Sequence, residues 1–371
     1  MTQILGFAPD DAARVLGEWL TARGEPRYRV SQLVPRLWQR PVRRWADATE
    51  LPRALREGLD AEWPLGALAL DVRQESSDGT VKYLWRLPDG QAVESVLISE
   101  GARRTLCISS QAGCPLRCAF CATGTMGLLR DLEEWEIAGQ VRELLLAPEP
   151  VRPTNVVFMG MGEPLLNWPA VSTALTLLND PAALGIGARH ITVSTVGILP
   201  GLAQLVKRPE QFRLAVSLHA PTSQTRRAIM PIDRKYPIRD VMTAIRAFKR
   251  RVTFEYVLIA DVNDRDEDGD ALAKLAKEAG AMVNLLPLHP GGGSKLQPSS
   301  ASRMRAFSAD LKARGIEAVL RRSRGLDIDA ACGQLRIARG DRRPREEVPA
   351  EPHRHVHEPG RVRQQPGTPH S

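Results

Sequence analysis

The run Gly113-Cys114-Pro115-Leu116-Arg117-Cys118-Ala119-Phe120-Cys121 places three cysteines at the spacing C-x3-C-x2-C. A structural zinc site or an ordinary ferredoxin cluster takes four protein ligands, so three thiols on one short loop are one ligand short. On a four-iron cluster, three cysteine ligands would leave one iron open to a small molecule. The spacing therefore marks Cys114, Cys118 and Cys121 as candidate metal ligands.

Two plainer interpretations of these cysteines stay open from the spacing alone. They could belong to a zinc site that a distant His or Cys completes. They could also be small apolar residues of a core, since free cysteine is often buried. The rest of the sequence has to decide between a cluster, a zinc site and simple packing.

Composition limits the class of protein. The chain has 371 residues, 43% hydrophobic and 25% charged, which is typical of a globular protein with one or two domains. Five cysteines at this length do not make a disulfide scaffold. The first residues show no leader pattern, and no run reaches the roughly 20 apolar residues of a membrane span. We therefore expect no signal peptide, no membrane and a reducing, cytoplasmic setting, which an oxygen-sensitive cluster would require.

The chain is basic, with a net charge of +8 and a pI of about 9.5. The excess recurs in clusters such as Arg40/Arg43/Arg44 and Lys249/Arg250/Arg251 instead of lying in one tail. Lysine and arginine displace counterions from phosphate, so this balance suits a polyanionic partner. Solvated helix faces would give the same clusters. Charge therefore favours a nucleic-acid partner without establishing one.

Changes of periodicity divide the chain into four predicted segments. Residues 1–65 show helical spacing, with Asp10 as the expected cap of the first helix, and are interpreted as a helical accessory RNA-binding domain. Residues 66–100 alternate in the way that predicts a β-hairpin extension. Residues 101–338 alternate short apolar strands with helices. Residues 339–371 lack large apolar side chains, which predicts a disordered tail.

The strand and helix alternation of residues 101–338 predicts an α/β fold with a partial (β/α)6 barrel. Chemistry in such barrels lies where the strands end. Polar or glycine-rich patches follow several predicted strands, and these are Gly160-Met161-Gly162-Glu163-Pro164, Ser194-Thr195, Ser217-Leu218-His219 and Leu288-His289-Pro290. Taken singly, each patch could be an ordinary polar loop.

Three residues outside these patches need an explanation. Glu94 lies on one strand face with Ala92 and Val96, and a carboxylate among apolar neighbours needs a partner, of which a nearby arginine is the simplest. Cys107 and Cys332 stand apart from the three clustered cysteines. By spacing alone, each of these two is more simply a buried small residue than a catalytic one.

The cysteine spacing, with Phe120 before the last cysteine, resembles that of the radical S-adenosylmethionine (SAM) enzymes, whose open iron binds SAM. Gly160-Met161-Gly162-Glu163-Pro164 resembles the motif that holds the SAM amino group in those enzymes. The resemblance implies a [4Fe-4S] cluster and a SAM site. The residues that would bind SAM are Gly162, Glu163, Ser194, Ser217, Leu218, His219 and His289.

Four blocks in sequence order resemble the RlmN/Cfr family of radical SAM methyltransferases, which methylate an adenine of 23S ribosomal RNA. The blocks are 105–124, 159–167, 217–221 and 327–335. The similarity covers about residues 10–338 and is strongest to the RlmN branch. The helical N-terminal segment is part of it.

The resemblance implies a mechanism with two SAM molecules. One would methylate Cys332, and reductive cleavage of the other at the cluster would give a radical that takes hydrogen from that methyl group. The resulting carbon radical would add to C2 of the adenine. Cys107 would resolve the protein–RNA adduct through a transient disulfide with Cys332, and Glu94 would accept a proton. A flavodoxin-type protein would supply electrons, and transfer RNA is a second substrate in some members.

The sequence departs from the family at one SAM position and leaves alternatives open. His289 stands where the family usually has Asn, and histidine is bulkier and titratable, although it can still make one hydrogen bond. Methylation at adenine C8, as in Cfr, is the first alternative. A non-catalytic, metal-containing RNA-binding paralogue is the second, and the presence of Glu94, Cys107 and Cys332 argues against it.

Overall fold

The computed structural model describes residues 3–289 and 295–335. The predicted tail, 339–371, lies outside the described residues. All described residues fall within one compact unit, and the division of that unit at residues 65 and 100 stays a prediction.

The N-terminal segment is helical, as predicted. Leucines at helical spacing, such as Leu16, Leu33 and Leu59, are fully buried and hold the helices together. The expected cap at Asp10 is wrong, because Ala8 is the N-cap residue and Pro9 begins the helix. Asp10 lies in the first turn, where its charge favours the helix dipole. The helices are α1 (Pro9–Thr21), α2 (Val30–Leu37) and α3 (Arg53–Glu62).

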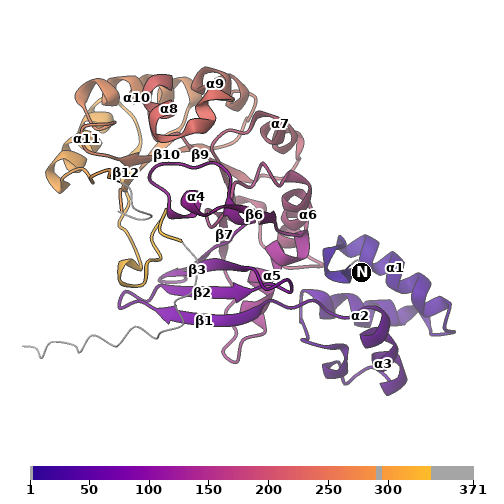
Figure 1. The fold of residues 1–371 in the computed structure, drawn as a ribbon. Coiled ribbons are helices and arrows are strands. Elements are labelled where there is room, and N and C mark those ends of the chain that lie inside the picture. Colours follow the sequence, from indigo (N-terminus) through magenta and orange to yellow (C-terminus); the bar gives the residue numbers. More distant parts are fainter. Residues whose placement is uncertain (1–2, 290–294, 336–371) are drawn as a thin grey trace, which may run out of the picture. The chain divides into compact units, whose positions relative to one another are not determined.

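A ten-stranded sheet carries most of the rest of the fold (Figure 1). Its first strands pair antiparallel, and from β4 onward each strand pairs parallel with the next. The antiparallel strands are β1 (Ala69–Glu75), β2 (Val81–Arg86) and β3 (Ala92–Glu100). The parallel strands are β4 (Arg103–Cys107), β7 (Asn155–Phe158), β8 (Ile191–Thr195), β9 (Arg213–Ser217), β10 (Val252–Leu258), β11 (Met282–Pro287) and β12 (Ala318–Leu320). The predicted α/β fold with a parallel barrel sheet is confirmed.

Helices follow the parallel strands and cover the outside of the sheet (Figure 1). Apolar strand residues such as Val156, Val193 and Phe254 are fully buried beneath them, so the main core lies between the sheet and these helices. The helices are α5 (Glu134–Leu145), α6 (Trp168–Asn179), α7 (Leu199–Lys207), α8 (Ser223–Ile229), α9 (Ile238–Ile245), α10 (Asp266–Ala279) and α11 (Ala301–Ala313).

The buried side chain of Arg142, on α5, joins the N-terminal helices to the barrel. Its guanidinium donates to the carbonyl oxygens of Leu37 at 2.8 Å and Val42 at 2.6 Å. Burial lowers its pKa to about 10, so it stays charged at neutral pH. Beside it, Arg43 pairs with the buried carboxylate of Glu143 at 3.1 Å.

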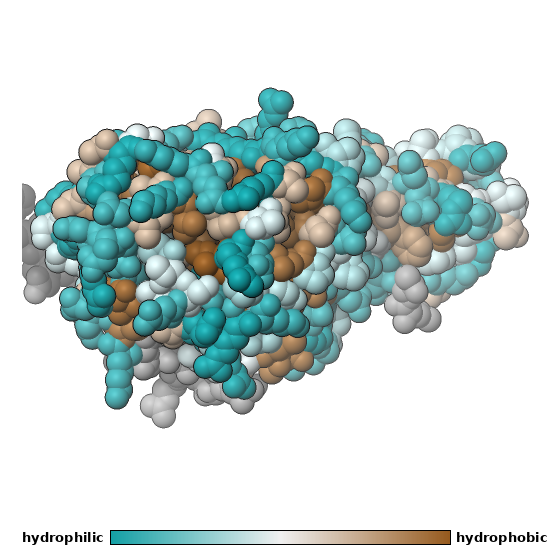
Figure 2. All heavy atoms as spheres, turned by 90° about the horizontal axis from the view of Figure 1, so that it is seen from above, coloured by the Kyte–Doolittle hydropathy of each residue, from teal (hydrophilic) through white to brown (hydrophobic). Residues whose placement is uncertain are grey.

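Hydrophilic side chains cover most of the face shown in Figure 2, and hydrophobic ones gather near its middle. Among the described residues, no helix combines the length and the apolar character that crossing a membrane requires.

Candidate active site

The three clustered cysteines lie at the end of a short strand and in the loop that joins it to a helix. Cys114 ends β5 (Gln111–Cys114), Cys118 lies in the loop, and Cys121 is the N-cap residue of α4 (Ala122–Met126). β5 pairs with β6 (Gly127–Asp131). The sequence predicted neither the two-stranded sheet nor the helix. Gly113 has φ +82, and a Cβ there would lie 2.0 Å from the carbonyl oxygen of Gly127. Only glycine fits this position, so the cysteine loop, residues 114–121, has a fixed start. Its other side is held by Ala119, whose N–H donates to Ile229 O at 2.9 Å.

The three thiols share one electrostatic environment. Burial, together with the charges of Cys121 and Glu163, raises the pKa of Cys114 to about 12. The pKa of Cys118 is also raised, first by burial and then by Cys121 and Cys114, while the buried guanidinium of Arg226 lowers it. At neutral pH such thiols become thiolates when a metal coordinates them.

The fit of a metal group can be tested on these residues. No three His, Cys, Asp or Glu side chains of the described ranges lie close enough together to hold a single metal ion. One zinc ion, bound at about 2.3 Å by each sulfur, needs such a group. A four-iron cluster is wider and takes its thiolates at its corners, and soft thiolates are its usual ligands. Cys114, Cys118 and Cys121 therefore fit a cluster better than a single zinc ion.

The glycine motif after β7 brings backbone close to the cysteine loop. A Cβ on Gly160 would lie 2.6 Å from Ile108 O, and one on Gly162, which has φ +99, would lie 2.6 Å from the side chain of Gln111. Glu163 is buried, and its carboxylate accepts from the N–H groups of Leu165 at 3.0 Å and Val196 at 2.9 Å. Burial raises its pKa to about 7. A ligand ammonium beside it would stabilise the ionised form.

The other predicted SAM residues lie at the ends of neighbouring strands. Ser194 is in β8 and Ser217 ends β9. His219 has φ +56, its Nδ1 accepts from Val257 N at 3.0 Å, and its ring stands edge-on to Phe120 with centroids 4.7 Å apart. Burial lowers the pKa of His219 to about 3, so it is neutral. Leu218 is fully buried, so its side chain serves the packing of the Ser217-Leu218-His219 segment and offers no polar group to a ligand.

His289, just after β11, is half-buried and hydrogen-bonds through Nε2 to Ser323. Burial lowers its pKa, which keeps the ring neutral. The ring already has a protein partner on Nε2, so a SAM contact would have to use Nδ1. The role of His289 stays a prediction.

Glu94 and Cys107 lie on the paired neighbouring strands β3 and β4. Glu94 on β3 is buried and pairs with Lys82 on β2 at 3.3 Å. This ion-pair partner is a lysine, whereas the sequence predicted a nearby arginine as the simplest partner. Cys107 ends β4, opposite Val96 of β3. Burial raises the pKa of Cys107, and the charge of Cys332 is the next cause. The two remaining cysteines therefore lie within electrostatic range of each other.

The segment that carries Cys332, residues 325–335, is held by polar contacts. Asp327 accepts from Ser76 Oγ at 2.6 Å, and Asp78 accepts from Gly325 N at 3.0 Å. Lys82 also donates to Asp329 O at 3.4 Å, so one side chain links Glu94 to this segment. At its other end, Gly333 O accepts from Ala122 N at 2.7 Å, beside Cys121.

Cys332 is exposed, whereas Cys107 is buried, and all five cysteines are free thiols. The residue as a whole is exposed, yet burial of its thiol raises the pKa of Cys332 to about 11, with the Glu255 carboxylate as the second cause and Arg321 acting in the opposite direction. Cys121 also raises it. Cys332 therefore lies within electrostatic reach of both Cys107 and the cysteine loop.

Sequence reasoning missed Glu255, a buried carboxylate on β10. Its Oε1 accepts from Asn284 Nδ2 at 2.9 Å, and its carbonyl oxygen accepts from Leu218 N at 3.1 Å. Burial raises its pKa to about 7. The signal was present, because Glu255 interrupts an apolar strand just as Glu94 does. Arg226 was also missed, and no local pattern distinguished it from other helix arginines.

Comparison with known proteins places this site in context. The family model described as "Radical SAM superfamily" matches residues 108–273 of this chain. This range includes the cysteine loop and the ends of the strands through β10. A solved structure, a radical SAM methyltransferase from Sphaerobacter thermophilus, is 40% identical and superimposes with a TM-score of 0.84, covering 91% of this chain and 99% of that one.

Two curated relatives carry the same name. A probable dual-specificity RNA methyltransferase RlmN from Gemmatimonas aurantiaca is 58% identical over 96% of this chain and 99% of its own length. A protein of that name from Geobacillus kaustophilus is 42% identical over 86% of this chain and 90% of its own length. The similarity therefore extends well beyond the cysteine motif.

Proposed function

From the premise that the chain belongs to the RlmN/Cfr family and is a radical SAM RNA methyltransferase most like RlmN, we propose its substrates. It methylates C2 of an adenine in 23S rRNA, and it also methylates an adenine in tRNA. The family implies SAM and a [4Fe-4S] cluster. The finer reaction uses a methyl-cysteine intermediate on Cys332 and two SAM molecules, in the reducing cytoplasm. A flavodoxin-type donor is the expected reductant.

One observation supports this proposal most strongly. Cys332 is an exposed residue, and it lies within electrostatic reach of both Cys107 and Cys121. Adenine C2 is not nucleophilic, so a carrier must bring the methyl group to it as a radical. A cysteine that interacts with both a candidate cluster ligand and a second thiol supports the proposal that Cys332 is that carrier.

Each residue has a task in this proposal. Cys114, Cys118 and Cys121 would hold the cluster, and Gly162, Glu163, Ser194 and Ser217 would hold SAM. When bound, the cluster and SAM supply the one-electron chemistry that no side chain provides. The exposed Cys332 carries the methyl group where an RNA base can reach it. Burial raises the pKa of the Cys107 thiol. Its sulfur would form a transient disulfide with the Cys332 sulfur as the bond between that sulfur and the transferred carbon breaks, which would release the methylated base.

Glu94 would remove the proton from the methylated base carbon. The Lys82 ammonium at 3.3 Å favours its ionised form, which a base needs. Because Lys82 also donates a hydrogen bond to the carbonyl oxygen of Asp329, it fixes the position of Glu94 relative to the Cys332 segment. Lys82 thus acts as a positioning residue.

Mass spectrometry of rRNA and tRNA from a deletion strain tests the substrate. We expect 2-methyladenine to disappear from both and to return with the wild-type gene. Loss of 8-methyladenine instead would assign the Cfr-type reaction, and loss of neither would refute methylation of these RNAs.

The variant Cys332→Ala tests the carrier. We expect methylation to be abolished while iron and sulfide content stay at the wild-type level, because Cys332 is not a cluster ligand. Retained methylation would remove Cys332 from the mechanism. Loss of iron would instead show that the alanine variant damages the cysteine loop.

A further inference from the structure

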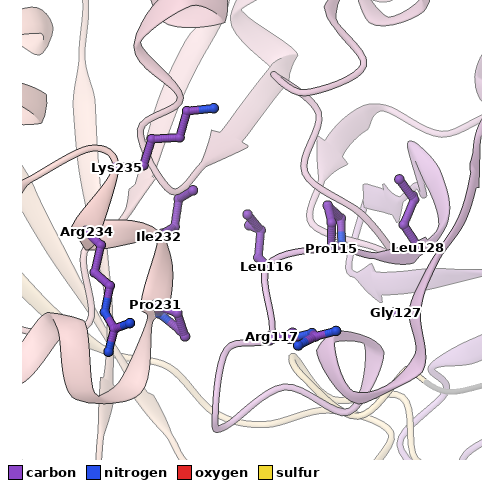
Figure 3. A pocket seen from close by; sticks show the side chains of 9 residues that line it. All are labelled: Pro115, Leu116, Arg117, Gly127, Leu128, Pro231, Ile232, Arg234 and Lys235. Atoms are coloured by element: carbon purple, nitrogen blue, oxygen red, sulfur yellow. The ribbon is translucent and has the colours of Figure 1, made fainter.

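A hollow of about 450 Å³ opens beside the cysteine loop. Figure 3 shows side chains of the loop and of the turn before α9 around it, with Leu116 and Ile232 toward its middle. Its lining residues are Pro115, Leu116, Arg117, Gly127, Leu128, Pro231, Ile232, Arg234 and Lys235. A second hollow of about 380 Å³ shares Arg117 and Gly127 with it and is lined by Cys118 itself.

The hollow is apolar in the middle and cationic at its edge. Arg117, Arg234 and Lys235 are exposed, and none of the residues that line it among those described is acidic. The nearest carboxylate in sequence, Asp233, is buried and pairs with Arg226 at 3.1 Å and Arg227 at 3.8 Å. The positive charge at the edge is therefore not balanced by Asp233.

We propose that this hollow is the docking surface for a small acidic electron-transfer protein. The inference rests on the proposed function, since only a redox cluster requires such a partner. Electron-transfer encounters are small and weak, and charge complementarity guides them. Three cations around Leu116 and the exposed Leu128 suit an acidic partner with an apolar centre.

The position of the hollow favours an electron donor over RNA. The Cys332 segment contacts the first residues after the cysteine loop, where Ala122 N donates to Gly333 O and Thr123 Oγ1 donates to Leu335 O, both at 2.7 Å. A target base must reach Cys332, and no described residue of the Cys332 segment lines the hollow or its neighbour. A donor seated on the hollow would therefore not have to contact the residue that the base must reach.

The electron balance of the step is simple. One electron would pass from the reduced flavin of the donor to the oxidised cluster that Cys114, Cys118 and Cys121 would hold. The residues of the hollow form and break no bonds and take up no proton. They would orient the donor beside Cys118, a buried residue that lines the second hollow.

The test is the affinity of the cluster-loaded protein for oxidised flavodoxin, measured by calorimetry at about 50 mM salt, where the Debye length exceeds 10 Å. We expect the double variant Arg234→Glu/Lys235→Glu to raise Kd by about tenfold or more, because it reverses two charges at the contact. The effect should shrink at high salt. Lys274→Glu, an exposed reversal on α10, is the matched control and should change Kd less than about twofold.

Three results separate the possible outcomes. An unchanged flavodoxin Kd in a double variant with normal iron content and thermal stability overturns the proposal. An equal loss of affinity for an rRNA hairpin would assign the hollow to RNA and overturn it too. Methylation driven by dithionite, which needs no docking, should be retained in the double variant; its absence from the wild-type protein as well would count against the proposed function instead.

Discussion

The cysteine loop and the Cys332 segment both carry cysteine thiols, but different kinds of contact hold the two regions in place. The loop starts at a glycine that no other residue can replace without a clash, and two of its thiols are buried. The Cys332 segment is tied down mainly by polar contacts to the β1–β2 turn, and Cys332 is an exposed residue. Under the proposed function the loop would hold a radical-generating cluster, which benefits from rigidity, whereas Cys332 would receive and deliver a methyl group, which requires access.

Gly113→Ala tests the rigidity of the loop and should have the largest effect. We expect a loss of stability of about 3 kcal/mol or more, because the methyl group would meet Gly127 O at 2.0 Å and φ is +82. Chemical denaturation and iron content measure it. Gly127→Ala is the control: its φ is +73 but nothing lies near its Cβ, so it should cost only about 1 kcal/mol. Equal costs for the two variants would contradict the clash.

Asp327→Ala tests how the Cys332 segment is held. We expect methylation to fall about tenfold while iron content is unchanged, because the bonds from Ser76 Oγ and Ser77 N are lost. Turnover with dithionite and iron analysis measure both. Asp270→Ala, which removes a surface ion pair with Arg314, should leave methylation unchanged. A parallel loss of iron in Asp327→Ala would mean that the two regions are not held separately.

Glu255→Gln tests the electrostatics of the exposed thiol. Removing this carboxylate should lower the pKa of Cys332 from about 11 and raise its alkylation rate at pH 9, because a larger fraction of the thiol is then ionised. The amide oxygen of Gln can still accept from Asn284. Arg321→Met removes the opposing charge and should slow alkylation. A change in the same direction for both variants would show that structure rather than charge is responsible.

Lowering the pH should loosen the Cys332 segment before the cysteine loop. Of the four predicted effects, this one should be the smallest. Hydrogen bonds from Thr80, Gly325 and Ser76 outweigh desolvation and hold the pKa of Asp78 at about 2, and the Ser76 hydroxyl lowers that of Asp327. Because both pKa values are depressed on folding, their stabilisation is complete above about pH 4 and is lost as pH falls toward 2. Both side chains are exposed, so screening limits the effect to about 1 kcal/mol.

Hydrogen–deuterium exchange between pH 5 and pH 2.5 measures that loosening. Residues 325–335 should gain exchange, after correction for the intrinsic pH dependence, before residues 113–131 do. Simultaneous exposure of both ranges would indicate global acid unfolding instead.

The sequence predicted what is encoded locally. Short apolar strands, glycine turns and the cysteine spacing identify the parallel barrel and the candidate ligands without any long-range information. It missed β1, in which every residue is exposed and no alternation marks a buried face. It also missed the β5–β6 pair, since Gly113 and Gly127 conceal the strand pattern there. The proximity of Cys332 to Cys107 and Glu255 depends on how distant strands pack, and no spacing in the chain reports it.

Arg142 shows how the two ends of such an enzyme can change independently. Its guanidinium binds the main-chain oxygens of Leu37 and Val42, which every amino acid possesses. The polar part of this joint therefore does not depend on side-chain identity at those two positions. The exposed surface of the N-terminal helices can therefore change in sequence while the polar attachment to the barrel stays the same.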